Sequence, residues 1–156
     1  MKLEFADWRF QVDAEATRRH TTKNASDHCE CAYCRNYYDT LASTYPDLCV
    51  VLAHFGIDPM GPSELMPFTP TLFLACYRVD GKILRWGKSE LNVGGIPIVA
   101  EAAEDDTFLL WVGELELPWV QEEAAEEVLS PANLPEFLER MQQVWQLRHG
   151  QEFVCS

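Results

Sequence analysis

The stretch TLFLACYRVDGKILRW, residues 71–86, decides the predicted fold. Its first half is apolar on both faces, as in a strand inside a sheet, and Asp80-Gly81 follows as a pair that tolerates positive φ. The run KILRW then resumes the strand-like composition. We therefore predict a tight β-hairpin with its turn at residues 80–81, which makes the sheet antiparallel.

A second hairpin is predicted directly after the first. The segment IPIVAEA (96–102) is followed by Glu104, Asp105 and Asp106 and then by TFLLWVGELELPW (107–119), in which large apolar residues keep one strand phase. The three acids could bind a cation, but acids favour solvated turns, and we expect a turn here. Gly113 inside the second run predicts a β-bulge.

The N-terminal region predicts one strand followed by a loop. Apolar and polar residues alternate over residues 3–12, as in a strand with one buried face. The polar segment TRRHTTKNAS (17–26) is interpreted as a loop that leads to a helix.

The next region predicts two helices joined as an antiparallel hairpin. Asp27 and Glu30 have the spacing of a capping box at the start of a helix over residues 28–43. Pro46 opens a second helix and Gly56 ends it. The apolar stripe of the first helix comprises Cys31, Cys34, Tyr38, Leu41, Ala42 and Tyr45.

Two further helical segments are expected near the C-terminus. An acidic, alanine-rich stretch over residues 121–129 is typical of a short exposed helix with Glu122, Glu123, Glu126 and Glu127 on its surface. Asn133 can cap a last helix that ends before Gly150. Its apolar face comprises Leu134, Phe137, Leu138, Met141, Val144, Trp145 and Leu147. Together these segments predict an α+β fold over residues 1–156, a single globular domain in which an antiparallel sheet of four to six strands is covered by the helical hairpin and the C-terminal helix.

The composition bounds the function. With 156 residues, of which 47% are hydrophobic, the chain can bury a core of ordinary size. Its net charge of −13 disfavours nucleic acid and anionic membranes and favours a basic protein or a cation as partner. No apolar run approaches the ~20 residues that span a bilayer, and the N-terminus lacks the apolar stretch of a signal peptide. We therefore expect a cytoplasmic protein with reduced thiols.

The segment HCECAYCRN (28–36) carries the main chemical candidate. Cys29, Cys31 and Cys34 form C-x-C-x-x-C, and three thiolates this close can bind zinc if a fourth ligand comes from elsewhere. If the two helices run antiparallel, a rise of about 1.5 Å per residue places His54 level with residue 36, within a turn of Cys34. We therefore predict a zinc site with Cys29, Cys31, Cys34 and His54 as ligands.

Two alternatives to the zinc site stay open. Cys31 and Cys34 can be small buried residues of the helix stripe, a role that cysteine often takes. They can also form a redox pair, because a helix N-terminus and Arg35 lower a thiol pKa, although the strand–helix context of thioredoxin-like motifs is missing. No catalytic residues and no other cofactor site are predicted, since Asp27, His28 and Cys29 are consecutive and cannot converge as a triad. The sequence favours a non-enzymatic binding or accessory protein, with a thiol-dependent enzyme or redox protein as the alternative.

Several short motifs occur in a fixed order: C-x-C-x-x-C-R-N-Y-Y (29–38), Y-P (45–46), F-G-I-D-P (55–59), P-S-E (62–64) and E-L-P-W-V (116–120). In this ordered set the chain resembles an uncharacterised family of small bacterial proteins. The resemblance implies that the three clustered cysteines act together, and it strengthens the metal interpretation.

Overall fold

The computed structural model of the chain describes residues 1–27, 29–69 and 71–122. These residues form three helices and one antiparallel sheet of seven strands, which confirms the α+β class but exceeds the predicted four to six strands. The elements are β1 (Lys2–Phe5), β2 (Trp8–Val12), α1 (Ala14–Ser26), α2 (Ala32–Thr44), α3 (Pro46–His54), β3 (Glu64–Thr69), β4 (Leu72–Arg85), β5 (Leu91–Val93), β6 (Ile96–Ala102) and β7 (Thr107–Glu116). The helix predicted over residues 134–149 and all but the first two residues of the acidic segment 121–129 lie outside the described residues.

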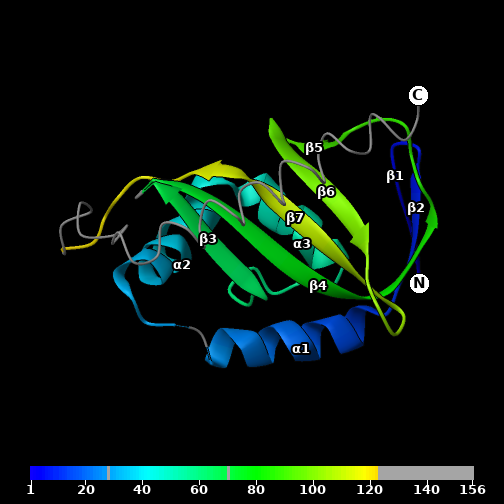
Figure 1. Cartoon of the computed structure of the whole chain (residues 1–156), viewed down its shortest axis with the longest axis horizontal. Coiled ribbons are helices and arrows are strands. Elements are labelled where there is room, and N and C mark those ends of the chain that lie inside the picture. Colours follow the sequence, from blue (N-terminus) through cyan, green and yellow to red (C-terminus); the bar gives the residue numbers. More distant parts are fainter. Residues whose placement is uncertain (28, 70, 123–156) are drawn as a thin grey trace.

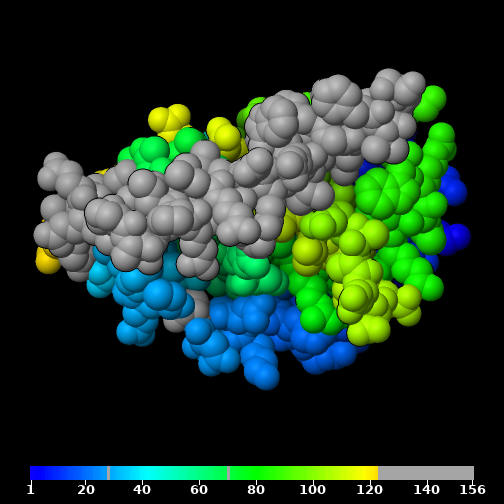
Figure 2. Space-filling view, in the orientation of Figure 1, coloured from blue at the N-terminus to red at the C-terminus, as the bar shows by residue number. Residues whose placement is uncertain are grey.

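The sheet is organised around β4. The strand order is β1-β2-β4-β7-β6-β5, and β3 pairs with β4 in addition (Figure 1). Residues 72–80 of β4 pair with β7, whereas residues 81–85 pair with β2. In Figure 1 the helix α3 lies behind the sheet, and the space-filling view shows α1, in blue, along the lower border of the molecule (Figure 2).

The predicted hairpin at residues 80–81 is wrong, because β4 continues through this point as one strand. Asp80 still pairs with Thr107 of β7, and Gly81 pairs with Val12 of β2, so the strand changes partners instead of reversing. A Cβ atom on Gly81 would lie 1.9 Å from the Gln11 carbonyl oxygen. The glycine is needed for this close approach of two backbones and not for a turn.

The second predicted hairpin is confirmed. β6 and β7 pair antiparallel, and the turn between them contains Asp105 and Asp106 at φ 56° and 57°. The predicted bulge is also present. Phe73 pairs with Leu115 and Leu74 pairs with Gly113, so that Glu114 is the extra residue.

The N-terminal strand prediction is wrong in its extent. Residues 3–12 form parts of two strands, since the chain reverses between Phe5 and Trp8, with Ala6 at φ 52°. The alternation itself was informative, because Trp8, Phe10 and Val12 are buried as expected for one face of β2. A two-residue turn inside an otherwise alternating run leaves the periodicity almost unchanged.

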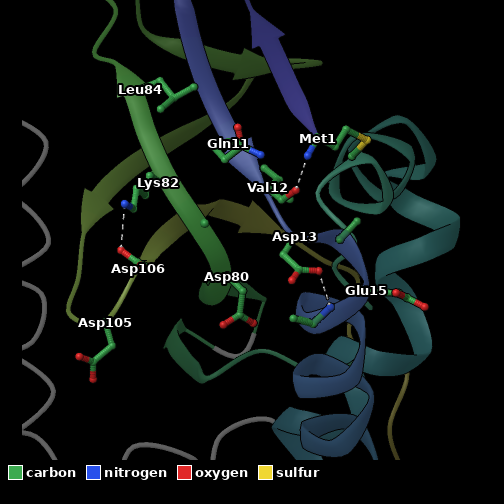
Figure 3. Close-up of a pocket in the computed structure, with 13 residues that line it drawn as sticks. Met1, Gln11, Val12, Asp13, Glu15, Asp80, Lys82, Leu84, Asp105 and Asp106 are labelled. Atoms are coloured by element: carbon green, nitrogen blue, oxygen red, sulfur yellow. Dashed lines mark hydrogen bonds and ion pairs between the residues drawn. The ribbon is translucent and has the colours of Figure 1, made fainter.

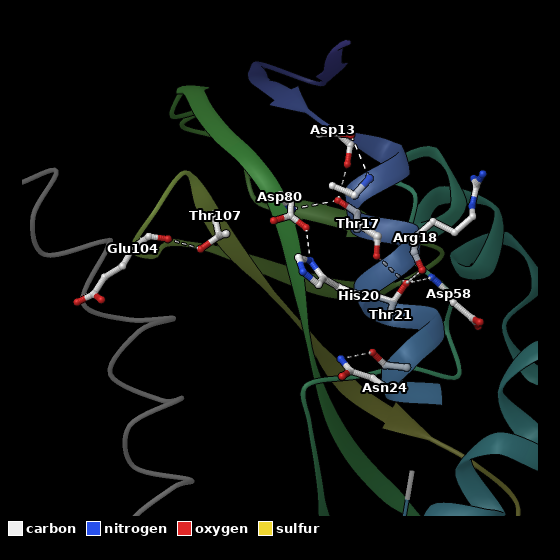
Figure 4. A network of polar contacts seen from close by, with 12 residues as sticks. Asp13, Thr17, Arg18, His20, Thr21, Asn24, Asp58, Asp80, Glu104 and Thr107 are labelled. Atoms are coloured by element: carbon white, nitrogen blue, oxygen red, sulfur yellow. Dashed lines mark hydrogen bonds and ion pairs between the residues drawn. The ribbon is translucent and has the colours of Figure 1, made fainter. Parts of the chain in front are cut away.

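The predicted loop over residues 17–26 is instead most of helix α1. Asp13 caps this helix by accepting a hydrogen bond from the Ala16 N–H at 3.0 Å. Its buried face consists of Thr17 and Thr21, whose hydroxyls accept hydrogen bonds from the backbone N–H groups of Asp80 and Asp58 at 3.0 and 2.9 Å (Figure 4). A face made of hydrogen-bonded threonines has no apolar periodicity, which explains the wrong prediction.

The next two helices differ from the prediction mainly at their starts. Asp27 ends α1, with its N–H bonded to the Lys23 carbonyl at 3.1 Å, and does not open the following helix. Cys31 is the N-cap of α2. α3 begins at Pro46 and is followed by Gly56 at φ 82°, as predicted.

One face of the sheet carries the main core. Side chains of α2 and α3 pack there against strand residues in a single buried cluster that includes Tyr37, Leu41, Leu52, Phe10 and Phe108. Among the helices that the structure describes, none is long and apolar enough to cross a membrane.

Candidate metal centre

Three cysteines meet at the start of α2. The Sγ atoms of Cys29, Cys31 and Cys34 all lie within 4.8 Å of one another, which makes this the one metal-compatible cluster within the described ranges. Three sulfurs around a tetrahedral zinc ion are about 3.8 Å apart, given Zn–S bonds of about 2.3 Å. A contraction of at most about 1 Å would therefore convert the cluster into three metal ligands.

Local backbone geometry brings the thiols together. Cys31 is extended at φ −64° and ψ 159°, and its N–H donates to Cys29 Sγ at 3.4 Å. Cys34 lies in the first turn of α2, three residues after this N-cap, on the side of the helix that faces Cys31. The spacing C-x-C-x-x-C thus joins an extended pair to a helical turn.

The thiols of Cys31 and Cys34 do not ionise equally. Partial burial disfavours the Cys31 thiolate, but interactions with the backbone N–H of Cys34 and with the thiols of Cys34 and Cys29 outweigh it and lower the pKa of Cys31. Burial has the largest effect on Cys34 and raises the pKa of its thiol far above the ordinary value. The hydrogen bond to Cys31 and the negative charge of the Cys31 thiolate raise it further. Of these two thiols Cys31 loses its proton first, and hydrogen bonds from its neighbours stabilise the thiolate.

Two tyrosines of α2 flank the cluster. Burial, together with the nearby Cys34, Cys29 and Cys31, raises the pKa of Tyr38 to about 12. The ring of Tyr33 packs edge-on against Trp119 at 5.6 Å, which places a tryptophan beside the site. A bound cation would relieve the charge that accumulates here.

Burial of the cysteines argues against a purely structural role. Cys29 and Cys31 are exposed and Cys34 is half-buried, whereas the fully buried residues of α2 are Asn36, Tyr37, Thr40 and Leu41. The predicted apolar stripe is therefore confirmed only in part: Leu41 is buried and Tyr38 and Tyr45 pack against the core, whereas Cys31 and Ala42 are exposed. Free cysteines that serve as small core residues are buried instead, as Cys76 is in this chain.

The structure does not bring His54 to the thiols. His54 and the thiols lie near different parts of β4. Gly56, two residues beyond His54, abuts the backbone of Ala14, close to Asp80 of this strand. Tyr33, beside the thiols, packs against Phe73 of the same strand. Asp80 and Phe73 are separated by seven residues of one strand, about 23 Å at about 3.3 Å per residue. α3 therefore continues along the sheet and does not fold back antiparallel to α2, the assumption on which the His54 prediction depended.

Three residues that the zinc prediction did not include are His28, Cys49 and Cys76. His28 lies outside the described residues. Cys49 is half-buried in α3, where burial raises its pKa. Neither Cys49 nor Cys76 belongs to the thiol cluster.

Asn36 supports the site and was missed by the sequence analysis. Its side chain is fully buried; Nδ2 donates to the Pro118 carbonyl oxygen at 3.0 Å, and Oδ1 accepts from the Val120 N–H at 2.8 Å. These bonds fasten the segment around Trp119 to α2. An asparagine in an amphipathic pattern counts as a surface residue, so periodicity could not identify it.

A second feature is an acidic groove of about 930 Å³ between β4 and the start of α1 (Figure 3). Three of its carboxylates already have partners in the fold. Asp13 caps α1, Asp80 contacts His20 Nδ1 at 2.6 Å, and Asp106 contacts Lys82 at 3.3 Å. These contacts explain the three carboxylates as parts of a helix cap and ion pairs.

Comparison of the chain with known protein families, with curated protein sequences and with solved structures finds no match. The resemblance to the bacterial family with the C-x-C-x-x-C-R-N-Y motif therefore stays a prediction.

Proposed function

We propose that this chain is a binding or accessory protein that holds a thiophilic metal ion, zinc foremost, on the thiolates of Cys29, Cys31 and Cys34. The observation that carries the proposal is the convergence of three Sγ atoms within 4.8 Å of one another. The lowered pKa of Cys31 also favours it, because metal binding requires deprotonated thiols. Thiolate ligands favour zinc or Cu(I) over magnesium or calcium.

The geometry favours a surface site over a structural one. All three ligands come from residues 29–34, and closing so short a segment adds little to the stability of the fold. Structural zinc sites usually have four protein ligands, whereas three ligands and exposed sulfurs leave a position open for water or for a ligand from a partner. The proposed function is therefore reversible metal binding, with the fourth position available for exchange.

The partner that we propose is a basic protein. The net charge of −13 and the exposed acids of the turn at Asp105 and Asp106 support this proposal. The affinity for such a partner should fall steeply as salt is raised from about 50 to about 300 mM, because added ions screen the attraction between exposed charges. Recovery of no basic protein in pull-downs at low salt would contradict it.

A second candidate function is dithiol redox chemistry at Cys31 and Cys34, and the asymmetry of their pKa values favours it. The Cys31 thiolate would attack a substrate disulfide and release one substrate thiolate. Cys34, after losing its proton, would attack the mixed disulfide and release the second. The substrate gains two electrons, and the protein is left with a Cys31–Cys34 disulfide.

Titration of the reduced, metal-free protein with Co²⁺ separates the two functions. We expect a thiolate-to-cobalt charge-transfer band and visible bands of tetrahedral cobalt that saturate at one equivalent and disappear when zinc is added. Cys31→Ser should abolish the charge-transfer band, whereas the matched variant Cys49→Ser should retain it. Absence of any cobalt band, together with a Cys31–Cys34 disulfide that forms in glutathione buffers, would contradict metal binding and support the redox function.

A further inference from the structure

The thiol cluster can bind a metal and still accept a ligand from outside the fold. Cys29, Cys31 and Cys34 supply three thiolates, and no fourth His, Cys, Asp or Glu from the part of the chain that the structure describes joins them. Cys29 and Cys31 are exposed and Cys34 is half-buried, so the remaining coordination position of a bound metal faces solvent. Because protein-bound zinc is almost always tetrahedral, an external ligand can enter at this position.

The three cysteines are anchored unequally. Cys34 lies in the first turn of α2, and the carbonyl oxygen of Cys31, the N-cap, accepts a hydrogen bond from the Arg35 N–H at 3.0 Å. Cys29 lies two residues before the N-cap, in the segment that joins α1 to α2, and belongs to no helix or strand. The backbone of Cys29 can therefore move without opening a helical turn, whereas the backbone of Cys31 and Cys34 is held by α2.

A hydrogen bond also favours release of Cys29 from a metal. The Cys31 N–H donates to Cys29 Sγ at 3.4 Å. A hydrogen bond to the charged form of a group stabilises that form, so this N–H stabilises a Cys29 thiolate that has rotated off the metal. The free-energy cost of detaching Cys29 is lowered accordingly.

We propose that this site passes its metal to the cysteine thiolates of a partner protein by ligand exchange, and that Cys29 is the first ligand displaced. The inference rests on the proposed metal binding. An acceptor thiolate forms a metal–sulfur bond at the solvent-facing position, and the metal–Cys29 bond then breaks. The acceptor thiol gives up one proton to solvent and the released Cys29 thiolate takes one back, so charge is conserved and no electron is transferred.

Charge around the site favours a basic acceptor. Residues 24–77, which include the site, α2 and α3, contain six Asp or Glu and a single Lys or Arg, which is Arg35. Asp27 and Glu30, on either side of Cys29, are exposed. Three thiolates around a divalent ion add a further negative charge. Complementary charge raises association rates by about 10–1000-fold, so the acceptor that we infer is a basic protein.

The acceptor should also present two cysteines close together. Once its first thiolate has displaced Cys29, its second thiolate attacks the same metal ion within one complex. The effective concentration of this second thiolate is then in the millimolar range or higher, which drives displacement of Cys31 and Cys34. A single thiol at the same concentration lacks this advantage.

Pulse alkylation of the zinc-loaded chain, resolved by mass spectrometry, tests the order of release. The acceptor probe is a synthetic peptide with C-x-x-C between lysines, and each thiol's rate with excess N-ethylmaleimide is divided by its rate in the metal-free chain. We expect zinc to protect all three thiols and the peptide to raise the relative rate of Cys29 at least about tenfold above that of Cys34. The same peptide with serines in place of its cysteines should leave Cys29 protected. Cys49, which lies outside the cluster, is the internal control and should not respond to zinc.

Two outcomes of this experiment would overturn the inference in distinguishable ways. Protection by zinc followed by release of Cys34 before Cys29, or of all three thiols together, would overturn the exchange order and leave metal binding intact. Thiols that zinc does not protect even without the peptide would overturn the proposed metal binding as well.

The kinetics of zinc transfer provide a second measurement on the unmodified chain. Exchange at the solvent-facing position predicts a rate that rises linearly with peptide concentration, whereas a rate independent of peptide concentration would overturn the inference, because zinc would then dissociate first. At about 50 mM salt, a peptide with glutamates in place of the lysines should react at least about tenfold more slowly. Equal rates for the two peptides would overturn the assignment of a basic acceptor.

Discussion

Asn36 offers a sharp test of how the site is held. The substitution Asn36→Ala removes the hydrogen bonds to the Pro118 carbonyl and the Val120 N–H. Each bond contributes about 0.5–1.5 kcal/mol net. Truncation of a side chain that is 0% exposed also leaves a void, so we expect the free energy of unfolding to fall by about 2–3 kcal/mol.

Gln121→Ala is the matched control. Gln121 fastens the same segment to the same helix through a bond from its Nε2 to Asp39 Oδ2 at 2.8 Å, but this bond is exposed. Its loss should change the free energy of unfolding by at most about 0.5 kcal/mol. The two substitutions therefore differ in burial and not in the elements they connect.

Urea denaturation of the metal-free protein measures both effects. We expect Asn36→Ala to lower the midpoint with an unchanged m-value, and Gln121→Ala to leave the midpoint close to that of the unmodified chain. Equal midpoints for Asn36→Ala and Gln121→Ala would refute the conclusion that the buried amide fastens the segment to α2.

Three further predictions concern the core, the backbone and the thiols. Leu52→Ala, at a residue 0% exposed, should lower the free energy of unfolding by about 2–5 kcal/mol. Val50→Ala, at a residue 58% exposed, should change it by at most about 0.5 kcal/mol. Equal destabilisation of the two variants in calorimetry would contradict the assigned core. Gly56→Ala places a Cβ atom 2.2 Å from a backbone oxygen at φ 82°, so urea denaturation should show a free energy of unfolding lower by more than about 3 kcal/mol. Gly94→Ala, at φ 58° with open space around it, should lower it by only about 1–2 kcal/mol. The alkylation rate of Cys31, followed against pH by mass spectrometry, should rise at a lower pH than that of a free cysteine peptide, because only the thiolate reacts and its pKa is lowered; a midpoint at or above that of the peptide would contradict the assignment.

The parts of the fold with ordinary periodicity were predictable. The β6–β7 hairpin, its acidic turn and the bulge at Gly113 follow from alternation and turn chemistry alone. The start of α3 at Pro46 follows from the position that proline tolerates in a helix. In each case the local conformational preference agrees with the tertiary structure, so a few consecutive residues are enough to predict the element.

Elements whose form depends on distant partners were not predictable. Asp80-Gly81 has the composition of a hairpin turn, yet β4 passes through it because β2 pairs with the strand beyond this point. Helix α1 buries Thr17 and Thr21 because the backbone of Asp80 and Asp58 supplies their hydrogen bonds. A sequence pattern does not specify which distant backbone groups will be present.

The candidate site also has a part that the sequence could predict and a part that it could not. The three cysteines are close in sequence, and the prediction that they can act together agrees with their convergence within 4.8 Å. The choice of His54 depended on the path of α3 relative to α2, a tertiary feature that helix spacing alone cannot specify. The lowered pKa of Cys31 depends on the backbone at the start of α2, and the predicted helix began four residues too early.

Metal analysis of the freshly purified chain tests the central claim most directly. We expect about one equivalent of zinc per chain in the unmodified protein and in Cys49→Ser. Cys31→Ser should lose at least about 90% of it, because losing even an outer-shell partner of a ligand costs about 10–100-fold in metal affinity and this variant loses a ligand itself. Protein that is free of metal after purification and also fails to retain added zinc would contradict the proposed metal centre.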